Sequence, residues 1–414
     1  MSKTGVSVIL QDSQLGTPQP KIGNCMLFYG SSAAAASTTP KLVTSVDSFN
    51  TWAALNEPTG IQNDAFLLAE VQKFYDNAPT GTYLWIYCID ASEGEDFITS
   101  NISAIKSAIR ATGQADFDNR PRIVGFVTDA KGTVSSSAIV PSTLETMVGS
   151  INTIYSDLFA ESYRITCVLA SDIDAKDMLT ETATKAPDCA SYNAPAVGVT
   201  FTTDVYTTTT GPDGSITAYK TQKDVAEIMG ILSAISLGQS IGSCARPSLA
   251  NIAFFNDPSN TVPVTNCVLS DYDAMGDNQM IFHRTRPGRG IFYNDGATCN
   301  DSTMALSKLE YSRLGNAVCD DAEYFFTGIL NTQAPVEPNG DLSKTYATQL
   351  NNTFYNQYCQ PRISQGQCSA INVEIGAQNN DFVGTKTIKV TISIQPSPNV
   401  EQVMVYVMYV KSVA

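Results

Sequence analysis

The stretch TKTIKVTISIQPSPNVEQVMVYVMYV, residues 385–410, decides how this chain is organised. Up to residue 394, isoleucine and valine alternate with lysine, threonine and serine, and this period of two predicts a strand with one buried face. Ile388, Val390 and Ile392 lie on the apolar face. The two prolines in 395–399 then predict a break, because each proline removes a backbone donor and fixes φ.

The second half of this stretch predicts another strand, over residues 403–410, that is apolar on both faces. One face carries Val403, Val405, Val407 and Tyr409. Such a strand needs cover on both sides, and its open edge can pair with another chain. We therefore expect the C-terminus to be a β-arm that adds to a sheet of a neighbouring copy.

The N-terminus carries a similar short apolar segment at residues 5–10, followed by polar residues 11–19. Its apolar members are Val6, Val8, Ile9 and Leu10. We expect this segment to be a second β-arm that also pairs with a neighbouring copy, with Val6, Val8 and Leu10 as contact residues.

Length and charge limit the possible classes of protein. A chain of 414 residues is too long for one ordinary core and predicts two or three domains. Its net charge of −15, from 25 basic and 40 acidic residues, argues against nucleic acid or an anionic membrane as the main partner. No signal-peptide pattern and no sufficiently long apolar run occurs, so membrane insertion is not expected.

The ten cysteines include no C-x-x-C pair, and the chain has one histidine. These counts predict neither a zinc site nor any other metal or cofactor site. Cys88 and Cys167 lie within apolar segments, which favours free thiols used as small hydrophobic residues and assembly in a reducing cytoplasm.

Strands and helices are predicted to alternate through the first half of the chain. Continuous apolar runs predict strands at 24–29, 83–89, 122–127, 163–169 and 197–201. Helical spacing predicts helices that begin near 45 and 63, and further helices at 97–111, 143–159, 174–184 and 224–237. Buried strands alternating with amphipathic helices predict an α/β domain with a mainly parallel sheet and helices on both faces.

The pattern changes after Pro247. A short strand is expected at 251–255, then helices at 306–327 and 344–358, the second ended by Pro361, and then a strand at 369–375. These elements and the strand at 385–394 predict a smaller α+β domain. The expected divisions are an N-terminal β-arm 1–22, an α/β domain 23–245, a turn-rich connecting segment 246–300, an α+β domain 301–395 and a C-terminal β-arm 396–414.

One catalytic pattern is present. Residues 238–242 fit G-x-S-x-G with Ser240 as nucleophile, and Asp271, Asp273 and His283 follow in the chain order of a hydrolase triad. That motif requires a strand before the serine, whereas the sequence predicts a helix there. A serine hydrolase is therefore the alternative interpretation, and we expect no catalysis.

Two further motifs surround His283. The segment from Asp271 begins like a calcium loop, but Met275 and Phe282 occupy positions that require oxygen ligands. Arg284, Arg286 and Arg289 form a basic cluster in an acidic chain. This cluster could dock an acidic partner or pair with carboxylates of its own subunit, and the second interpretation is favoured.

The order of the segments resembles the contractile tail sheath proteins of phages and their relatives in tailocins and other contractile injection systems. Residues 5–8 are similar to the family's opening arm strand, 23–30 to the next strand and its small-residue loop, and 42–49 to its V-T-S-x-x-x-F element. Residues 66–75 and 83–89 resemble the helix and strand that follow. The closing strand, proline turn and final apolar strand are similar as well.

The resemblance implies a structural subunit without catalysis. Such subunits form stacked hexameric rings around an inner tube, are tied by strand exchange through both termini, and contract to drive the tube through a cell envelope. It also implies assembly in the bacterial host cytoplasm and a place in a virion tail, where contraction serves viral genome ejection. A capsid or tube protein fits less well because of the long α/β domain.

The resemblance also suggests partners and contact residues. The implied partners are copies of the same chain, the inner tail tube protein, and baseplate and tail terminator proteins. Ile388, Val390 and Ile392 would belong to the acceptor strand for the arms, whereas Lys344 and Arg362 are candidates for the side that faces the tube.

Overall fold

The computed structural model describes residues 23–31, 35–91, 96–113, 119–129, 144–174, 187–205, 223–247, 249, 253–255, 262–263, 273, 275–286, 288–376 and 381–398. Both expected arm strands lie outside the described residues. Their contact residues are therefore not placed: Val6, Val8, Leu10, Val403, Val405, Val407 and Tyr409.

An eight-stranded sheet forms the centre of the larger part of the molecule, with strand order β2-β3-β1-β4-β5-β6-β7-β8. Its strands are β1 (Cys25–Ser31), β2 (Lys41–Val43), β3 (Leu84–Asp90), β4 (Ile123–Thr128), β5 (Thr166–Asp174), β6 (Val197–Val205), β7 (Ala253–Phe255) and β8 (Val262–Pro263). The five strands from β3 to β6 in this order are parallel, and β2, β7 and β8 are antiparallel additions at the two edges. The predicted mainly parallel sheet is confirmed.

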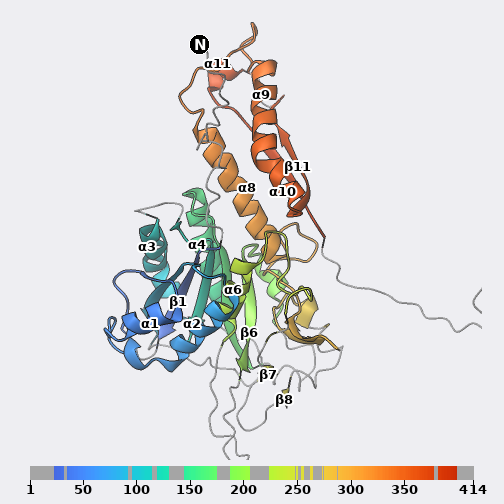
Figure 1. Ribbon diagram of the computed structural model, residues 1–414. Coiled ribbons are helices and arrows are strands. Elements are labelled where there is room, and N and C mark those ends of the chain that lie inside the picture. The colour runs from blue at the N-terminus through green and yellow to red at the C-terminus, as the bar shows by residue number, and fades with distance from the viewer. Residues whose placement is uncertain are drawn as a thin grey trace, which may run out of the picture.

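Helices cover both faces of this sheet, as predicted (Figure 1). One face packs against α1 (Val46–Ala53), α2 (Ala65–Asn77) and α6 (Val225–Ala234), and the other against α3 (Ile102–Thr112) and α4 (Leu144–Ala160). The side chains of β1 are buried in both directions, because Leu27 and Tyr29 belong to one core and Met26 and Phe28 to the other. Burial on both faces explains why these strands are continuous apolar runs.

Local side-chain caps fix the first two helices where the sequence predicts them. The Ser45 hydroxyl accepts a hydrogen bond from the Ser48 backbone N–H at 3.1 Å, and Asp64 Oδ1 accepts one from the Leu67 N–H at 2.9 Å. Each bond satisfies a donor that the first helical turn leaves open. The predicted helix at 174–184 lies outside the described residues except for Asp174, which ends β5.

The segment after α6 contributes to the large sheet and adds a hairpin. β7 pairs with β6, and β8 with β7. The hairpin consists of β9 (His283–Arg286) and β10 (Gly290–Tyr293). The strand expected at 251–255 is therefore present as β7, which lies between β6 and the edge strand β8.

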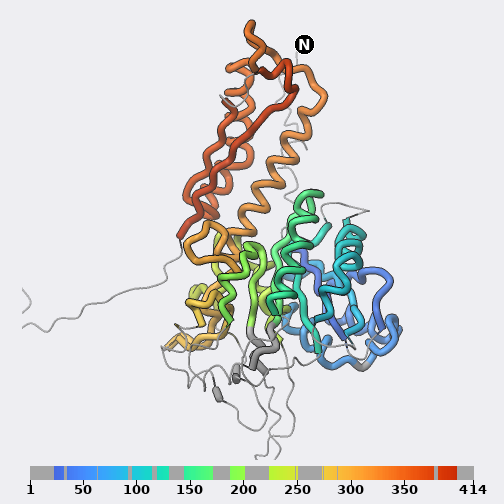
Figure 2. Tube along the Cα trace, turned by 180° about the vertical axis from the view of Figure 1, so that it is seen from behind, coloured from blue at the N-terminus to red at the C-terminus, as the bar shows by residue number. Residues whose placement is uncertain are grey.

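The rest of the chain forms an elongated unit that projects from the sheet (Figures 1 and 2). The helix α8 (Leu309–Thr327) leads away from the sheet, and α9 (Lys344–Phe354) returns beside it. A π-helical turn (Tyr355–Cys359) and α10 (Gln360–Ser364) follow, then β11 (Cys368–Glu374), α11 (Phe382–Thr385) and β12 (Thr391–Pro396). Phe354 is buried between Phe325 and Phe326 of α8, which fixes the two long helices together.

Two predicted boundaries in this unit are wrong. Pro361 does not end the second helix, because the Gln360 N–H bonds to the Tyr355 carbonyl five residues back. This wide turn lets the chain continue into α10 although Pro361 has no N–H to donate. The strand expected from 385 begins at Thr391, because 382–385 form α11 and Lys386 takes a left-handed conformation.

Candidate assembly surface and the polar sites around it

The candidate assembly surface is the antiparallel sheet of β11 and β12. Ile371 pairs with Ile394, and Val373 with Ile392. In the described part of the chain this sheet has two strands. Two strands alone are marginal in water, so packing against a helix or a further strand must stabilise them.

The alternating side chains of residues 388–394 lie as the sequence predicts. Val390, Ile392 and Ile394 are partly buried against the cluster that contains Leu314 and Phe354, whereas the intervening threonine and serine are exposed. Ile388 packs with a second small cluster around Leu350. The expected acceptor residues therefore share one face, which is turned toward α8 and α9.

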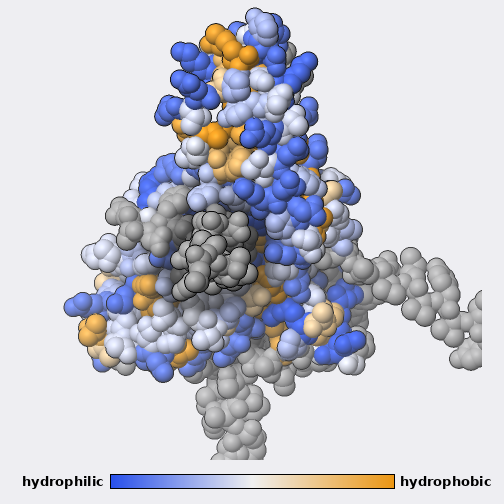
Figure 3. Space-filling view, turned by 45° about the horizontal axis from the view of Figure 1, so that its top comes forward, coloured by the Kyte–Doolittle hydropathy of each residue, from blue (hydrophilic) through white to orange (hydrophobic). Residues whose placement is uncertain are grey.

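An apolar groove of about 660 Å³ lies along this face. Its wall combines Phe326 of α8, residues 329–332, Ala334, Tyr346 of α9, and the pair Ile388 and Val390. Apolar side chains are also exposed at the far end of the unit: Leu330, Val336 and Val383 are 67%, 46% and 56% accessible. Figure 3 shows apolar patches on this part of the surface.

The two candidate tube-facing residues have different environments. Lys344 begins α9 and is exposed. Arg362 is buried, its Nε donates to Asp321 Oδ2 at 2.7 Å, and its Nη1 donates to Gln367 Oε1 at 3.0 Å. The assignment of Arg362 to an exposed contact surface is therefore wrong, because its guanidinium is engaged inside its own subunit.

A buried ion cluster joins α8 to the central strands. Asp320 accepts hydrogen bonds from Arg120 Nη2 and Arg164 Nη1, both at 2.8 Å, and from Arg122 Nη1. Arg164 also donates to Glu323 at 2.6 Å. The sequence gives no sign of this cluster, because each arginine is at least 156 residues from Asp320.

A second buried cluster ties α2 and α6 to the β9–β10 hairpin. Lys73 Nζ lies 3.3 Å from Asp224 Oδ1 and 4.0 Å from Glu227 Oε2, and His283 Nδ1 lies 3.6 Å from Asp224 Oδ2. Burial lowers the pKa of His283 to about 4. Burial raises the pKa of Glu70 to about 7, and the Glu70 carboxylate accepts hydrogen bonds from the Lys223 and Ala226 N–H groups. The imidazole is therefore neutral at pH 7.

The ligand atoms of Asp224, Glu227 and His283 lie within 4.8 Å of one another, as in a metal site. The Lys73 ammonium already supplies a positive charge beside both carboxylates. This arrangement fits an internal ion cluster better than a metal centre, because a cation bound there would be repelled by Lys73.

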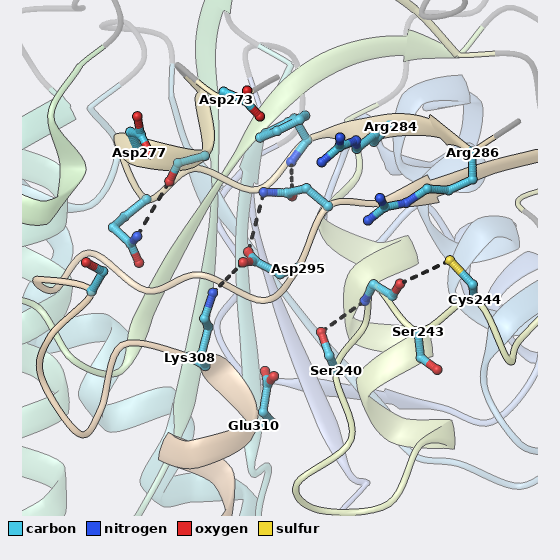
Figure 4. Close-up of a pocket in the computed structure, with 16 residues that line it drawn as sticks. Ser240, Ser243, Cys244, Asp273, Asp277, Arg284, Arg286, Asp295, Lys308 and Glu310 are labelled. Atoms are coloured by element: carbon cyan, nitrogen blue, oxygen red, sulfur yellow. Dashed lines mark hydrogen bonds and ion pairs between the residues drawn. The ribbon is translucent and has the colours of Figure 1, made fainter. Parts of the chain in front are cut away.

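The serine-hydrolase interpretation is not supported by the geometry. Ser240 follows the helix α6 instead of a strand, and its Oγ accepts a hydrogen bond from the Gly242 N–H at 3.2 Å. Ser240 and Asp273 line a polar pocket of about 870 Å³ (Figure 4), but His283 is not among the described residues of that pocket. The imidazole faces the two carboxylates of the α6 region, and Asp271 lies outside the described residues.

The basic cluster borders the same pocket. Arg284 and Arg286 of β9 line its wall, while Arg289 lies in the hairpin turn. The wall also carries acidic residues of the same chain: Asp273, Asp277, Asp295 and Glu310. The Lys308 ammonium pairs with the Asp295 carboxylate. The pocket is therefore of mixed charge, and the starting residue of the calcium-like loop is not described.

The nine described cysteines form no disulfide, and seven of them are buried. Burial raises the pKa of the Cys88 thiol to about 12, which keeps it protonated and unreactive at pH 7. Among the helices that the structure describes, none has the length and hydropathy needed to cross a bilayer.

The fold is similar to that of solved contractile sheaths. The anti-feeding prophage helical sheath in its contracted state aligns with a TM-score of 0.59, at 11% identity, over 99% of both chains. The chain has the fold of a contractile sheath protein. The contracted sheath complex of an extracellular contractile injection system, PVC, gives a TM-score of 0.57 at 11% identity, over 100% of this chain and 98% of the other.

The sheath fold is also found in a chain of the anti-feeding prophage baseplate structure, with a TM-score of 0.56, 11% identity and 99% coverage of both chains. No protein-family model matches the sequence, and no curated protein matches it. The likeness therefore lies in the three-dimensional arrangement and extends from one end of the chain to the other.

Proposed function

We propose that this protein is the repeating subunit of a contractile sheath. The observation that carries the proposal is the alignment of the whole chain with subunits of contracted sheaths, over 98% or more of both chains. An alignment of this extent supports a subunit of the same overall fold. The proposed role is mechanical and involves no catalysis.

In the proposed assembly, neighbouring subunits exchange their terminal β-arms. The apolar segments at 5–10 and 403–410 would pair with the β11–β12 sheet of other copies, where Ile388, Val390 and Ile392 hold β12 against the helices. Main-chain pairing of this kind adds a strand to an existing sheet. It can also survive rotation of the attached domains, because residues 11–19 and the residues that follow β12 would act as hinges.

The subunits would form stacked hexameric rings around an inner tube and would contract to drive that tube through a cell envelope. Lys344 is the remaining candidate for a tube contact, because it is exposed at the start of α9. Baseplate and terminator proteins would bind the two ends of such a sheath. The expected location is a phage tail or a related injection device assembled in bacterial cytoplasm.

Electron microscopy of the purified full-length protein tests this function. Helical tubes of uniform diameter are the expected product. If concentrated protein stays a dispersed monomer under conditions in which it is folded, the sheath proposal is contradicted. A serine-directed covalent probe provides a second check: labelling that disappears in Ser240→Ala would indicate a hydrolase instead.

A further inference from the structure

An uncharged surface runs along α9 and α10. Residues 345–373 contain one charged side chain, that of Arg362, and it is buried, whereas 16% of the whole chain is charged. The two helices and the π-helical turn between them run along one side of the projecting unit (Figure 1). Solvent therefore meets amide and hydroxyl side chains here, in a protein whose net charge is −15.

Exposed amide side chains recur at short steps along this helical segment. They belong to Gln349, Asn352, Asn356, Gln357 and Gln360. Residues three or four positions apart lie on the same side of a helix, and all of these except Gln357 follow one another at such steps. The five amides therefore form one continuous surface, which we call the amide face.

The amide face has hydrogen-bonding groups that the subunit itself does not use. Within the described part of the chain, none of the five amides makes a side-chain hydrogen bond. The neighbouring hydroxyls are engaged, because Thr348 donates to the Lys344 carbonyl at 2.9 Å and Thr353 donates to the Gln349 carbonyl at 2.8 Å. The groups available to a partner on this surface are therefore the amides.

The charge of the molecule favours a second copy of the chain as the partner. Two copies that each carry a net charge of −15 repel each other, so contact between them costs least where the surface is uncharged. Charged residues are also depleted from the cores of protein interfaces. Each amide both donates and accepts hydrogen bonds, so the amide face can pair with an identical face, which a surface of carboxylates cannot do.

We propose that the amide face is a contact between copies of this chain in the assembled sheath, made by hydrogen bonds between amides of facing copies. The inference rests on the proposed sheath function. The helical segment 344–364 is about 30 Å long, and a strip one helix wide is smaller than the about 800 Å² per partner that a stable interface buries. The contact therefore forms where other contacts already hold the copies together.

Photo-crosslinking tests the contact in the full-length protein. Benzoylphenylalanine would be incorporated at position 352, and the protein would be irradiated under the conditions used for tube formation. We expect a covalent dimer whose crosslink maps to residues 344–364 of the second copy. The same amino acid at position 72, which is exposed on α2, is the control and should not crosslink to this segment. Tubes that give no crosslink from position 352 to 344–364 overturn the proposal.

Charge substitutions give an independent test. Gln349→Glu combined with Gln357→Glu should raise the protein concentration needed for assembly by about fivefold, because like charges then face each other across the contact. Gln62→Glu combined with Gln72→Glu adds the same charge at exposed positions near α2 and should leave that concentration unchanged. Equal effects of the two pairs overturn the proposal, since repulsion would then depend on net charge alone.

The outcomes separate this contact from the sheath function. Tubes without the crosslink contradict the amide-face contact and leave the sheath proposal in place. A crosslinked dimer in a sample without tubes supports the contact and contradicts the sheath proposal. If neither tubes nor crosslinks form, both are overturned.

Discussion

Asp320 joins α8 to the central strands through a buried ion cluster. Three arginines donate to its carboxylate, and its side chain is 6% exposed. Removing one member of a buried ion cluster leaves the others charged and unpaired, which costs more than loss of an exposed pair. Asp320 is therefore expected to be important for stability.

Asp320→Asn should lower the free energy of unfolding by about 3–5 kcal/mol, because three buried guanidinium groups lose their common counter-ion. The measurement is urea unfolding followed by circular dichroism. Asp157→Asn, in the exposed pair with Lys106, is the matched control and should cost less than about 1 kcal/mol. Similar losses in the two variants would contradict the role assigned to Asp320.

Gly230 marks the closest approach of α6 to α2. A Cβ atom at this position would lie 2.5 Å from the Phe74 carbonyl oxygen. Gly230→Ala should therefore destabilise the protein by about 1–3 kcal/mol through displacement of the two helices. Thermal unfolding measures the effect.

Gly149→Ala is the control for Gly230→Ala, because Gly149 also lies in a helix and a Cβ there has nothing within 4 Å. It should stabilise the protein by about 0.5–1 kcal/mol through higher helix propensity. A loss of stability at Gly149, or no loss at Gly230, would show that the packing of α6 is described incorrectly.

His283 predicts a pH dependence of defined sign. Burial lowers its pKa from 6.5 to about 4 in the folded protein. Between pH 4 and 6.5 the unfolded chain binds more protons at His283 than the folded protein does. The contribution of His283 to stability is therefore present above pH 6.5 and is lost as the pH falls toward 4. Glu70 acts in the opposite direction, because its raised pKa favours the protonated folded state and stability is lost as the pH rises from about 4.5 to 7.

The His283 titration can be measured directly, because it is the only histidine in the chain. NMR of histidine-labelled protein should give one imidazole signal that stays neutral down to about pH 4. An unfolded sample of the same protein is the control and should titrate near 6.5. A folded-state midpoint near 6.5 would mean that the imidazole is accessible to water.

Side chains that act locally could be predicted from the sequence, and those that act over long range could not. Ser45 and Asp64 each cap a helix that starts beside them, so the residue type and its place before an apolar run were sufficient. Asp320 lies on α8, and its arginines lie beside strands of the sheet. The four residues come together only through the folded arrangement of the sheet and that helix, which the sequence does not reveal. The triad suggested by Ser240 and His283 failed for the same reason, since chain order does not place side chains in space.

At the scale of elements, the periodicity of apolar residues predicted the buried face of a strand better than it predicted where strands and helices begin and end. The alternation of Ile388, Val390 and Ile392 predicted which side of the segment is covered, and the structure confirms it. The start of β12 was missed, because an extended chain can alternate before it has a pairing partner. The predicted end of the helix at Pro361 was wrong, because a single π-helical turn accommodates the proline and such a turn leaves no clear trace in sequence.

The β11–β12 sheet should become more protected when subunits assemble. Amide hydrogen exchange in residues 388–396 should slow at least tenfold in assembled tubes relative to the monomer, because an added strand would bind free main-chain groups. Residues 25–31 of β1 are the internal control, since this strand already has a parallel neighbour on each side. Equal exchange of 388–396 in both states would argue against strand addition at this sheet.

At the scale of the whole molecule, the alignment with contracted sheaths covers 99% or more of this chain. The fold class could be predicted from the alternation of apolar strands and amphipathic helices. The strand at 251–255 was also predicted, but its place in the large sheet and the two-residue strand β8 beside it were not, because they follow a change in pattern.

The terminal arms test the central claim most directly. Three forms would be compared by negative-stain electron microscopy at equal concentration: the full-length protein, a form lacking residues 1–12 and a form lacking residues 401–414. Circular dichroism would establish that all three are folded. We predict helical tubes for the full-length protein and folded monomers for both truncated forms, whereas tubes of unchanged appearance from either truncated form would contradict assembly through exchanged terminal strands.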